Sequence, residues 1–193
     1  MWTALLFSVY LYHSRGLHKA HRGAHRALCL PILRGGDMEP NHPWVAWAYQ
    51  EMSKGIRRQG SNPRILDYFN LHTDNIDKPV IRDNLDWCSA FMSSAFEESR
   101  MRSPRSVVAR HWLRWGEPTE FKPGAVVVFW RVNPSSWQGH VGIALEDLGA
   151  TILTLGGNQL GKVGINRYLK SQLLGFRWPS NYSLRDYYGL DPL

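Results

Sequence analysis

The chain has 193 residues, which is enough for one domain with a hydrophobic core. Hydrophobic residues make up 44% and charged residues 20%, which excludes an intrinsically disordered chain. The formal net charge of +7 suits an anionic polymer or surface, but no arginine-rich stripe, zinc-finger spacing or aromatic RNA-binding motif is present, so we expect no nucleic-acid partner.

Residues 1–37 read as an N-terminal extension of the domain. Residues 2–12 form an apolar run too short to span a bilayer, which needs roughly 20 residues. No basic residue precedes this run and no clear cleavage site follows it, so no secretory signal is predicted. A histidine-rich, basic stretch comes next, typical of a poorly ordered segment that could also lie on a membrane surface. We therefore expect the domain over residues 38–180 and a tail over 181–193.

Helix signals fill the first half of this domain. Pro43 suits a helix start and Gly55 its end, while Asn62-Pro63 provides an N-cap and a first-turn proline for a second helix. The polar stretch 71–84 lacks the glycine and the terminal glutamate of a calcium loop, so its aspartates are read as turn residues. Ser103-Pro104 predicts a further helix, which ends near Gly116.

Between these signals lies Leu85–Phe91, where a polar segment meets an amphipathic run that predicts a helix beginning near Trp87. A cysteine in the first helical turn faces unpaired backbone N–H groups and the positive end of the helix dipole, which lower its pKa. Cys88 is therefore a candidate nucleophile, and a buried structural cysteine is the alternative. Cys29 lies in a segment of different character, so neither a disulfide nor a zinc site is expected. The residues of this helix predicted to face water are Ser93, Ser94, Glu97 and Glu98.

From Pro123-Gly124 onward the hydrophobic period becomes that of strands. Five short strands are predicted, over residues 125–130, 139–145, 151–155, 163–168 and 173–178. Helices followed by antiparallel strands predict an α+β fold. His140 begins the second of these strands, and Asn158 and Gln159 follow the third.

Hydrolysis of an amide by a thiol needs a thiolate, an imidazole, a polar group that orients the imidazole, and N–H donors for the oxyanion. Cys88 and His140 can supply the first two, and the backbone at the helix start can supply the donors. Asn158 is our choice as the orienting group, with Gln159 as the alternative. Taken singly these signals are weak, since a strand histidine is more often structural and Gly-Gly-Asn-Gln also suits a turn.

The motifs Asp86-Trp87-Cys88-Ser89-Ala90-Phe91, Gly139-His140-Val141-Gly142 and Gly156-Gly157-Asn158-Gln159 occur in this order along the chain. Together they resemble the NlpC-type and CHAP-type papain-like cysteine peptidases and amidases of the cell wall. The likeness is greatest to a branch with Trp-Cys and Gly-Gly-Asn-Gln motifs, found among phage lysins and bacterial wall hydrolases. The resemblance covers roughly Met38 to Pro179. Ala125 departs from it, because an Asp usually follows Pro-Gly before the histidine strand.

The resemblance implies a papain-like fold, in which a helix that starts at the nucleophile packs on a small antiparallel sheet. It implies a triad of Cys88, His140 and Asn158 that cleaves an amide or peptide bond of peptidoglycan, without metal or cofactor. The expected enzyme is a monomer that acts on the cell wall, in the periplasm or outside the cell, after release by phage lysis or secretion. Trp87 and Trp137 are candidate walls of a substrate groove, with a core position as the alternative for Trp87.

Other functions also remain open at this level. One is acyl transfer or thioester hydrolysis on lipids, which the apolar run at residues 2–12 mildly favours. Another is a catalytically inactive wall-binding module, in which Cys88 would have the reactivity of an ordinary thiol. A metalloamidase is not predicted, because the four histidines of the domain form no HExxH pair.

Overall fold

The computed structural model describes residues 42–74 and 85–182, which belong to one compact unit over residues 35–193. The predicted extension 1–37 and most of the predicted tail 181–193 lie outside the described residues. The helices are α1 (Pro43–Ser53), α2 (Pro63–His72) and α3 (Cys88–Glu98), with 3₁₀ turns η2 (Ala109–Arg114) and η3 (Lys170–Gln172). The strands are β1 (Glu117–Thr119), β2 (Val126–Trp130), β3 (Gly139–Asp147), β4 (Thr151–Gln159), β5 (Lys162–Leu169) and β6 (Leu173–Trp178).

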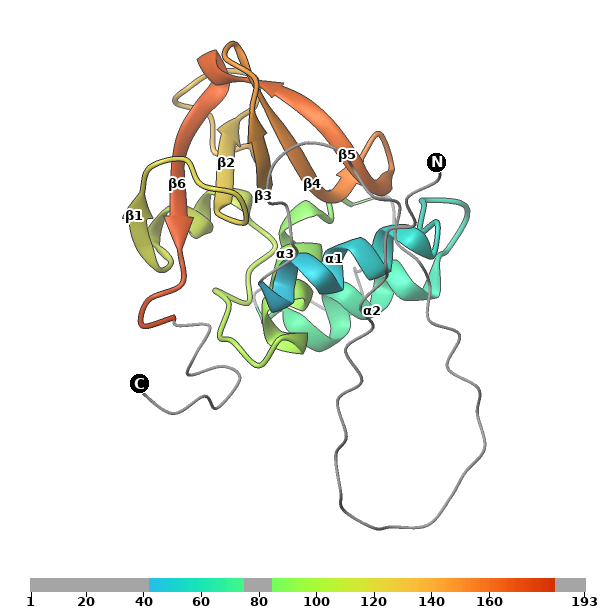
Figure 1. Cartoon of the computed structure of the whole chain (residues 1–193). Coiled ribbons are helices and arrows are strands. Elements are labelled where there is room, and N and C mark those ends of the chain that lie inside the picture. Colours follow the sequence, from blue (N-terminus) through green and yellow to red (C-terminus); the bar gives the residue numbers. More distant parts are fainter. Residues whose placement is uncertain (1–41, 75–84, 183–193) are drawn as a thin grey trace, which may run out of the picture. The chain divides into compact units, whose positions relative to one another are not determined.

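This element order confirms the predicted α+β class (Figure 1). The strands form one antiparallel sheet in the order β1-β6-β2-β3-β4-β5. Helix α3 contacts β3 and β4, while α1 and α2 both pack against α3. Helix α3 therefore lies between the sheet and the other two helices. Within residues 42–74 and 85–182, no helix has the length and apolar character needed to cross a bilayer.

The helix starts follow the predicted local signals. Pro43 and Pro63 each occupy the first turn, where the missing proline N–H costs no hydrogen bond. The Asn62 side-chain oxygen accepts a hydrogen bond from the Arg64 backbone N–H at 3.0 Å, so Asn62 is the predicted N-cap of α2.

The helix predicted from Ser103-Pro104 was wrong, because the segment forms only the 3₁₀ turn η2, which begins at Ala109. The Ser103 hydroxyl accepts from the Arg105 N–H and the Ser106 hydroxyl accepts from the Val108 N–H, both at 3.0 Å. Such local side-chain bonds offer the backbone an alternative to a helix. Arg105 also has a φ of 48°, in the left-handed region, which a right-handed helix does not admit.

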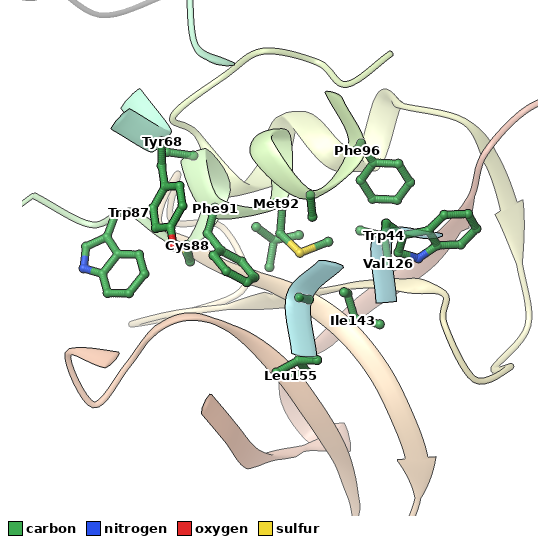
Figure 2. Packing of buried hydrophobic residues seen from close by; sticks show 14 of the residues in the cluster. Trp44, Tyr68, Trp87, Cys88, Phe91, Met92, Phe96, Val126, Ile143 and Leu155 are labelled. Atoms are coloured by element: carbon green, nitrogen blue, oxygen red, sulfur yellow. The ribbon is translucent and has the colours of Figure 1, made fainter. Parts of the chain in front are cut away.

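The main core lies between α3 and the sheet, where large side chains from both are fully buried (Figure 2). Phe91, Met92 and Phe96 of α3 belong to the same cluster as Val126, Ile143 and Leu155 of β2, β3 and β4. The prediction that Ser93 and Ser94 face water was wrong, since both are buried. Helices α1 and α2 pack against α3 and remove these serines from water.

The other face of the sheet carries a smaller cluster around Val127, Phe129, Ala144 and Ile152. Successive residues of a strand point to opposite faces, so Val141 and Ile143 of β3 pack on the helix side. His140 lies between Gly139 and Val141 and points to the other face, where its ring stacks on Tyr168. At the start of β3, Val141 therefore faces α3, whereas the adjacent His140 faces the other side of the sheet.

Candidate active site

Cys88 is the first residue of α3, as the sequence predicts for a nucleophile. The backbone N–H groups of Val141 and Ser89 lie near the Cys88 sulfur and favour its ionised form. One of these groups belongs to the first turn of the helix and the other to β3, so the thiol lies where α3 meets the sheet. Only 2% of the Cys88 surface is exposed to solvent.

Cys88 nevertheless forms part of the wall of a pocket of about 270 Å³. Leu85 and Asp86 contribute the wall on the N-terminal side of Cys88, and Trp137, Gln138 and Gly139 contribute the β2–β3 loop and the start of β3. The remaining lining residues are Phe69, Val107, Val108 and Ala109. A ligand in this pocket would therefore reach the sulfur from the end of the sheet where β3 begins.

The predicted lowering of the Cys88 pKa was wrong for this state of the protein. Burial raises the pKa of the Cys88 thiol above its usual value, because the charged thiolate loses its hydration. Arg131 and the two backbone N–H groups act in the opposite direction, and Asp86 adds to the increase. A helix start does favour the thiolate, but here the cost of desolvation is larger.

The His140 side chain is fully buried, and its ring lies parallel to that of Tyr168 with 4.5 Å between the ring centroids. Burial and the neighbouring Arg131 cation lower the pKa of His140 to about 3. Since the guanidinium can only donate, the 3.4 Å contact between Arg131 and His140 Nδ1 makes Nδ1 the acceptor. A neutral His140 therefore carries its proton on Nε2, which has no hydrogen-bond partner among the described residues.

Cys88 and His140 both lie where the start of α3 meets the start of β3. Among the hydrogen bonds of the described residues, none joins these two side chains. Val141, whose backbone N–H lies near the Cys88 sulfur, is the next residue after His140. The charge of Arg131 acts on both residues, and Cys88 also influences the pKa of Tyr168, on which the His140 ring stacks. The two side chains thus reach the junction from opposite faces of β3.

The predicted pairing of Asn158 with His140 is not found. The Asn158 amide donates to Asp86 at 2.7 Å, and its oxygen accepts from Arg58 at 3.2 Å. The pairing of β4 with β5 shifts register between Gly156 and Gln159, and Asn158 has a φ of 56° in the left-handed region. Such a bulge breaks the strict alternation of side chains. Asn158 is thereby directed to Asp86, two residues before the cysteine.

Gln159, the alternative orienting group, does not reach His140 either. Its side-chain amide donates to the backbone oxygens of Thr154 and Gly164 at 2.8 and 2.9 Å. These bonds satisfy backbone acceptors where the β4–β5 pairing is interrupted. Gln159 is therefore a structural residue of the bulge.

Sequence reasoning gave no role to the ion pair of Asp86 and Arg131, although Asp86 belongs to the cysteine motif. Arg131 Nη1 lies 3.3 Å from Asp86 Oδ2, and its Nη2 lies 3.4 Å from His140 Nδ1. A chain of polar contacts therefore runs from His140 through Arg131 and Asp86 to Asn158. Arg131 directly follows β2, the partner strand of β3, and this position was the available signal for it.

The two candidate groove tryptophans have different positions. Trp137 is 73% exposed and lines the pocket beside Cys88, which is consistent with a groove wall. Trp87 is fully buried, with its ring packed against Tyr68 and Phe91. The prediction of Trp87 as a groove wall was therefore wrong, and its alternative, a position in the core, is correct. As the N-cap of α3, Trp87 points into the core, and it is not among the residues that line the pocket.

Gly157 of β4 allows the strand to approach the start of α3. A Cβ atom at this position would lie 2.5 Å from the Phe91 Cβ and 2.7 Å from the Trp87 ring. We expect Gly157→Ala to lower the free energy of unfolding by about 1–3 kcal/mol, because neither buried neighbour can move away. Urea unfolding followed by tryptophan fluorescence would measure this change.

Gly164→Ala on β5 is the matched control for this substitution. Its added Cβ atom would meet only the flexible Lys162 side chain, at 3.5 Å or more. A Gly157→Ala protein as stable as the Gly164→Ala protein would contradict the close packing of β4 on α3.

Among the described residues, no group of three or more histidine, cysteine, aspartate or glutamate side chains is arranged to hold a metal ion. Comparisons with protein-family models, with curated proteins and with solved structures find no match to this chain. The function is therefore inferred from the geometry of the site and from the motifs of the sequence.

Proposed function

We propose that this chain is a papain-like thiol hydrolase that cleaves an amide or peptide bond of peptidoglycan. The observation that carries the proposal is the position of Cys88, which begins α3, has the backbone N–H groups of Ser89 and Val141 near its sulfur, and lines a pocket. A buried structural cysteine needs neither donors of this kind nor a pocket. His140 supports the proposal, because its imidazole contacts Arg131, whose charge also acts on the thiol.

In the proposed reaction the Cys88 sulfur attacks the carbonyl carbon of the scissile amide. Backbone N–H groups at the start of α3 stabilise the oxyanion, and the C–N bond breaks as the leaving nitrogen gains a proton. Water then attacks the thioester and releases the carboxylate, which restores the thiol. His140 is the proposed proton carrier in both halves of this cycle, and this role requires its Nδ1 to separate from Arg131 and bind a proton when substrate occupies the pocket.

The choice of peptidoglycan rests on the motif resemblance and on two properties of the pocket. Its outer wall holds the exposed ring of Trp137, and aromatic rings of this kind provide stacking surfaces for sugars and peptides. Its inner wall holds the buried Cys88. An extended wall polymer suits this arrangement better than a compact metabolite.

Digestion of purified peptidoglycan, followed by mass spectrometry of the soluble fragments, tests the proposal. We expect new amino and carboxyl termini in equal amounts, which identify the bond that is cut. If the protein leaves the sacculi undigested but transfers or hydrolyses acyl groups of phospholipid vesicles, the result would instead support the lipid-acting alternative. Binding to sacculi without any new termini would support a catalytically inactive wall-binding module.

Trp137 is expected to contribute to substrate binding rather than to the chemical step. We expect Trp137→Ala to raise the KM for soluble peptidoglycan fragments about tenfold and to leave kcat nearly unchanged, because the ring lines the pocket rim without contacting the sulfur. Steady-state kinetics would measure both constants. Leu71→Ala, which also removes an exposed apolar side chain, is the control. An equal rise of KM in Leu71→Ala would show that KM responds to the loss of any exposed apolar side chain, and would contradict a specific role of Trp137 in binding.

A further inference from the structure

The pair Asp86–Arg131 has no role in the proposed reaction. Arg131 contacts His140, and Asp86 lies two residues before Cys88, so the pair lies beside both candidate residues. A Cys88 thiolate requires a counter-cation. We propose that the Arg131 guanidinium, held in place by Asp86, is the counter-cation of the Cys88 thiolate, instead of a protonated His140. This inference rests on the proposed function, since it concerns how the same cysteine is activated.

His140 is not the resting cation. Its side chain is fully buried, and Arg131 lies 3.4 Å from Nδ1, the atom that would have to take up the proton. A second positive charge at this distance is unfavourable, and burial acts in the same direction, so the pKa of His140 falls to about 3. Near neutral pH the imidazole is therefore uncharged.

Arg131 is the cation that remains beside the thiol. It lies 3.3 Å from Asp86, two residues before Cys88, and 3.4 Å from His140, the neighbour of Val141. Its charge is permanent and favours the Cys88 thiolate. Asp86 is an anion and Tyr168 stays protonated, with a pKa that burial raises to about 12, so neither can replace Arg131. Arg58 bonds to Asn158 and to the Leu85 backbone oxygen.

Asp86 and Asn158 hold Arg131 in place through a chain of polar contacts. Asp86 Oδ2 contacts Arg131 Nη1, while Asp86 Oδ1 accepts from the Asn158 amide at 2.7 Å. Asn158 is fixed in turn by Arg58. Asp86 and Asn158 are thus positioning residues, which act on the thiol through Arg131. On ionisation the thiol proton passes to solvent through the pocket, and Arg131 and Asp86 both keep their charges.

The rate of Cys88 alkylation by iodoacetamide, measured against pH on the full chain, tests this inference. An opposite charge nearby lowers a pKa by about one to three units, so Arg131→Gln should slow labelling at neutral pH about tenfold or more. Arg131→Lys, which keeps the charge, should restore most of the rate. His140→Gln should leave the midpoint of the pH profile unchanged.

Arg167→Gln is the matched control, because Arg167 is an exposed residue of β5 and loses the same charge. A midpoint that rises in His140→Gln as much as in Arg131→Gln would overturn the inference, as would an unchanged midpoint in Arg131→Gln. If Arg131→Gln fails to fold by circular dichroism, the His140→Gln profile alone decides between the two cations. Alkylation needs no wall substrate, so undigested sacculi would refute the proposed function and leave this result standing.

Discussion

Replacing Cys88 by alanine is expected to abolish peptidoglycan hydrolysis, with a loss of about 10⁴-fold or more in rate. The substitution removes the sulfur that attacks the carbonyl carbon, and no other free cysteine occurs among the described residues. The fold should survive, because alanine fits the space of a small buried thiol and only two backbone N–H groups lose the sulfur as a neighbour. Release of soluble fragments from sacculi, together with the thermal unfolding midpoint, would measure both expectations.

Cys29→Ala is the matched control, since it removes the other cysteine of the chain, which lies outside the described residues. This variant is expected to keep full activity. Cys88→Ser adds a second comparison, because its hydroxyl keeps a polar atom near the N–H groups of Ser89 and Val141 but is a poor nucleophile without strong activation. A Cys88→Ala protein that still solubilises sacculi would refute the thiol mechanism.

The fold could be predicted wherever local signals and tertiary packing agree. Asn62 and Pro63 determine the start of α2 through the backbone alone, and the alternation of small and β-branched residues located β3. The helix expected after Ser103-Pro104 failed because two serine hydroxyls bond to nearby N–H groups, which a hydrophobic period cannot reveal. The burial of Ser93 and Ser94 likewise depends on α1 and α2 packing over α3.

The candidate site could be predicted only in part, for a related reason. The motif located Cys88 at a helix start, a local property, but its raised pKa follows from burial, which depends on the whole fold. Asn158 was assigned to His140 because it follows the neighbouring strand. A bulge in β4 turned it to Asp86 instead. Contacts such as Asp86–Arg131, 45 residues apart in the chain, leave no periodic signal in the sequence.

A second large effect is expected where Glu51 joins α1 to α2. Only 1% of the Glu51 side chain is exposed, and its carboxylate accepts two bonds from Arg64, both at 2.9 Å, and one from the Tyr68 hydroxyl at 2.6 Å. Lys54 adds a fourth contact. Burial alone would raise the pKa of Glu51, but the hydrogen bonds from Arg64, Lys54 and Tyr68 outweigh it and lower the pKa to about 2.

This lowered pKa makes the Glu51 contribution dependent on pH in a definite direction. Because the folded-state pKa lies below the ordinary value of 4.5, the contribution is complete above that value and is lost as the pH falls toward 2. A shift of this size corresponds to about 3 kcal/mol of unfolding free energy. We expect Glu51→Gln to lose about this amount at neutral pH, and urea unfolding of both proteins across the acid range would measure it.

The difference between wild type and Glu51→Gln should therefore shrink as the solution is acidified, because the wild-type carboxylate also becomes neutral. Glu98→Gln is the control, since Glu98 is an exposed carboxylate whose one described partner is His72. Its stability should follow the wild-type curve closely, as expected for a surface pair. A Glu51→Gln deficit that stays constant down to acidic pH would mean that Glu51 stabilises the helices by shape and hydrogen bonding, without a contribution from its charge.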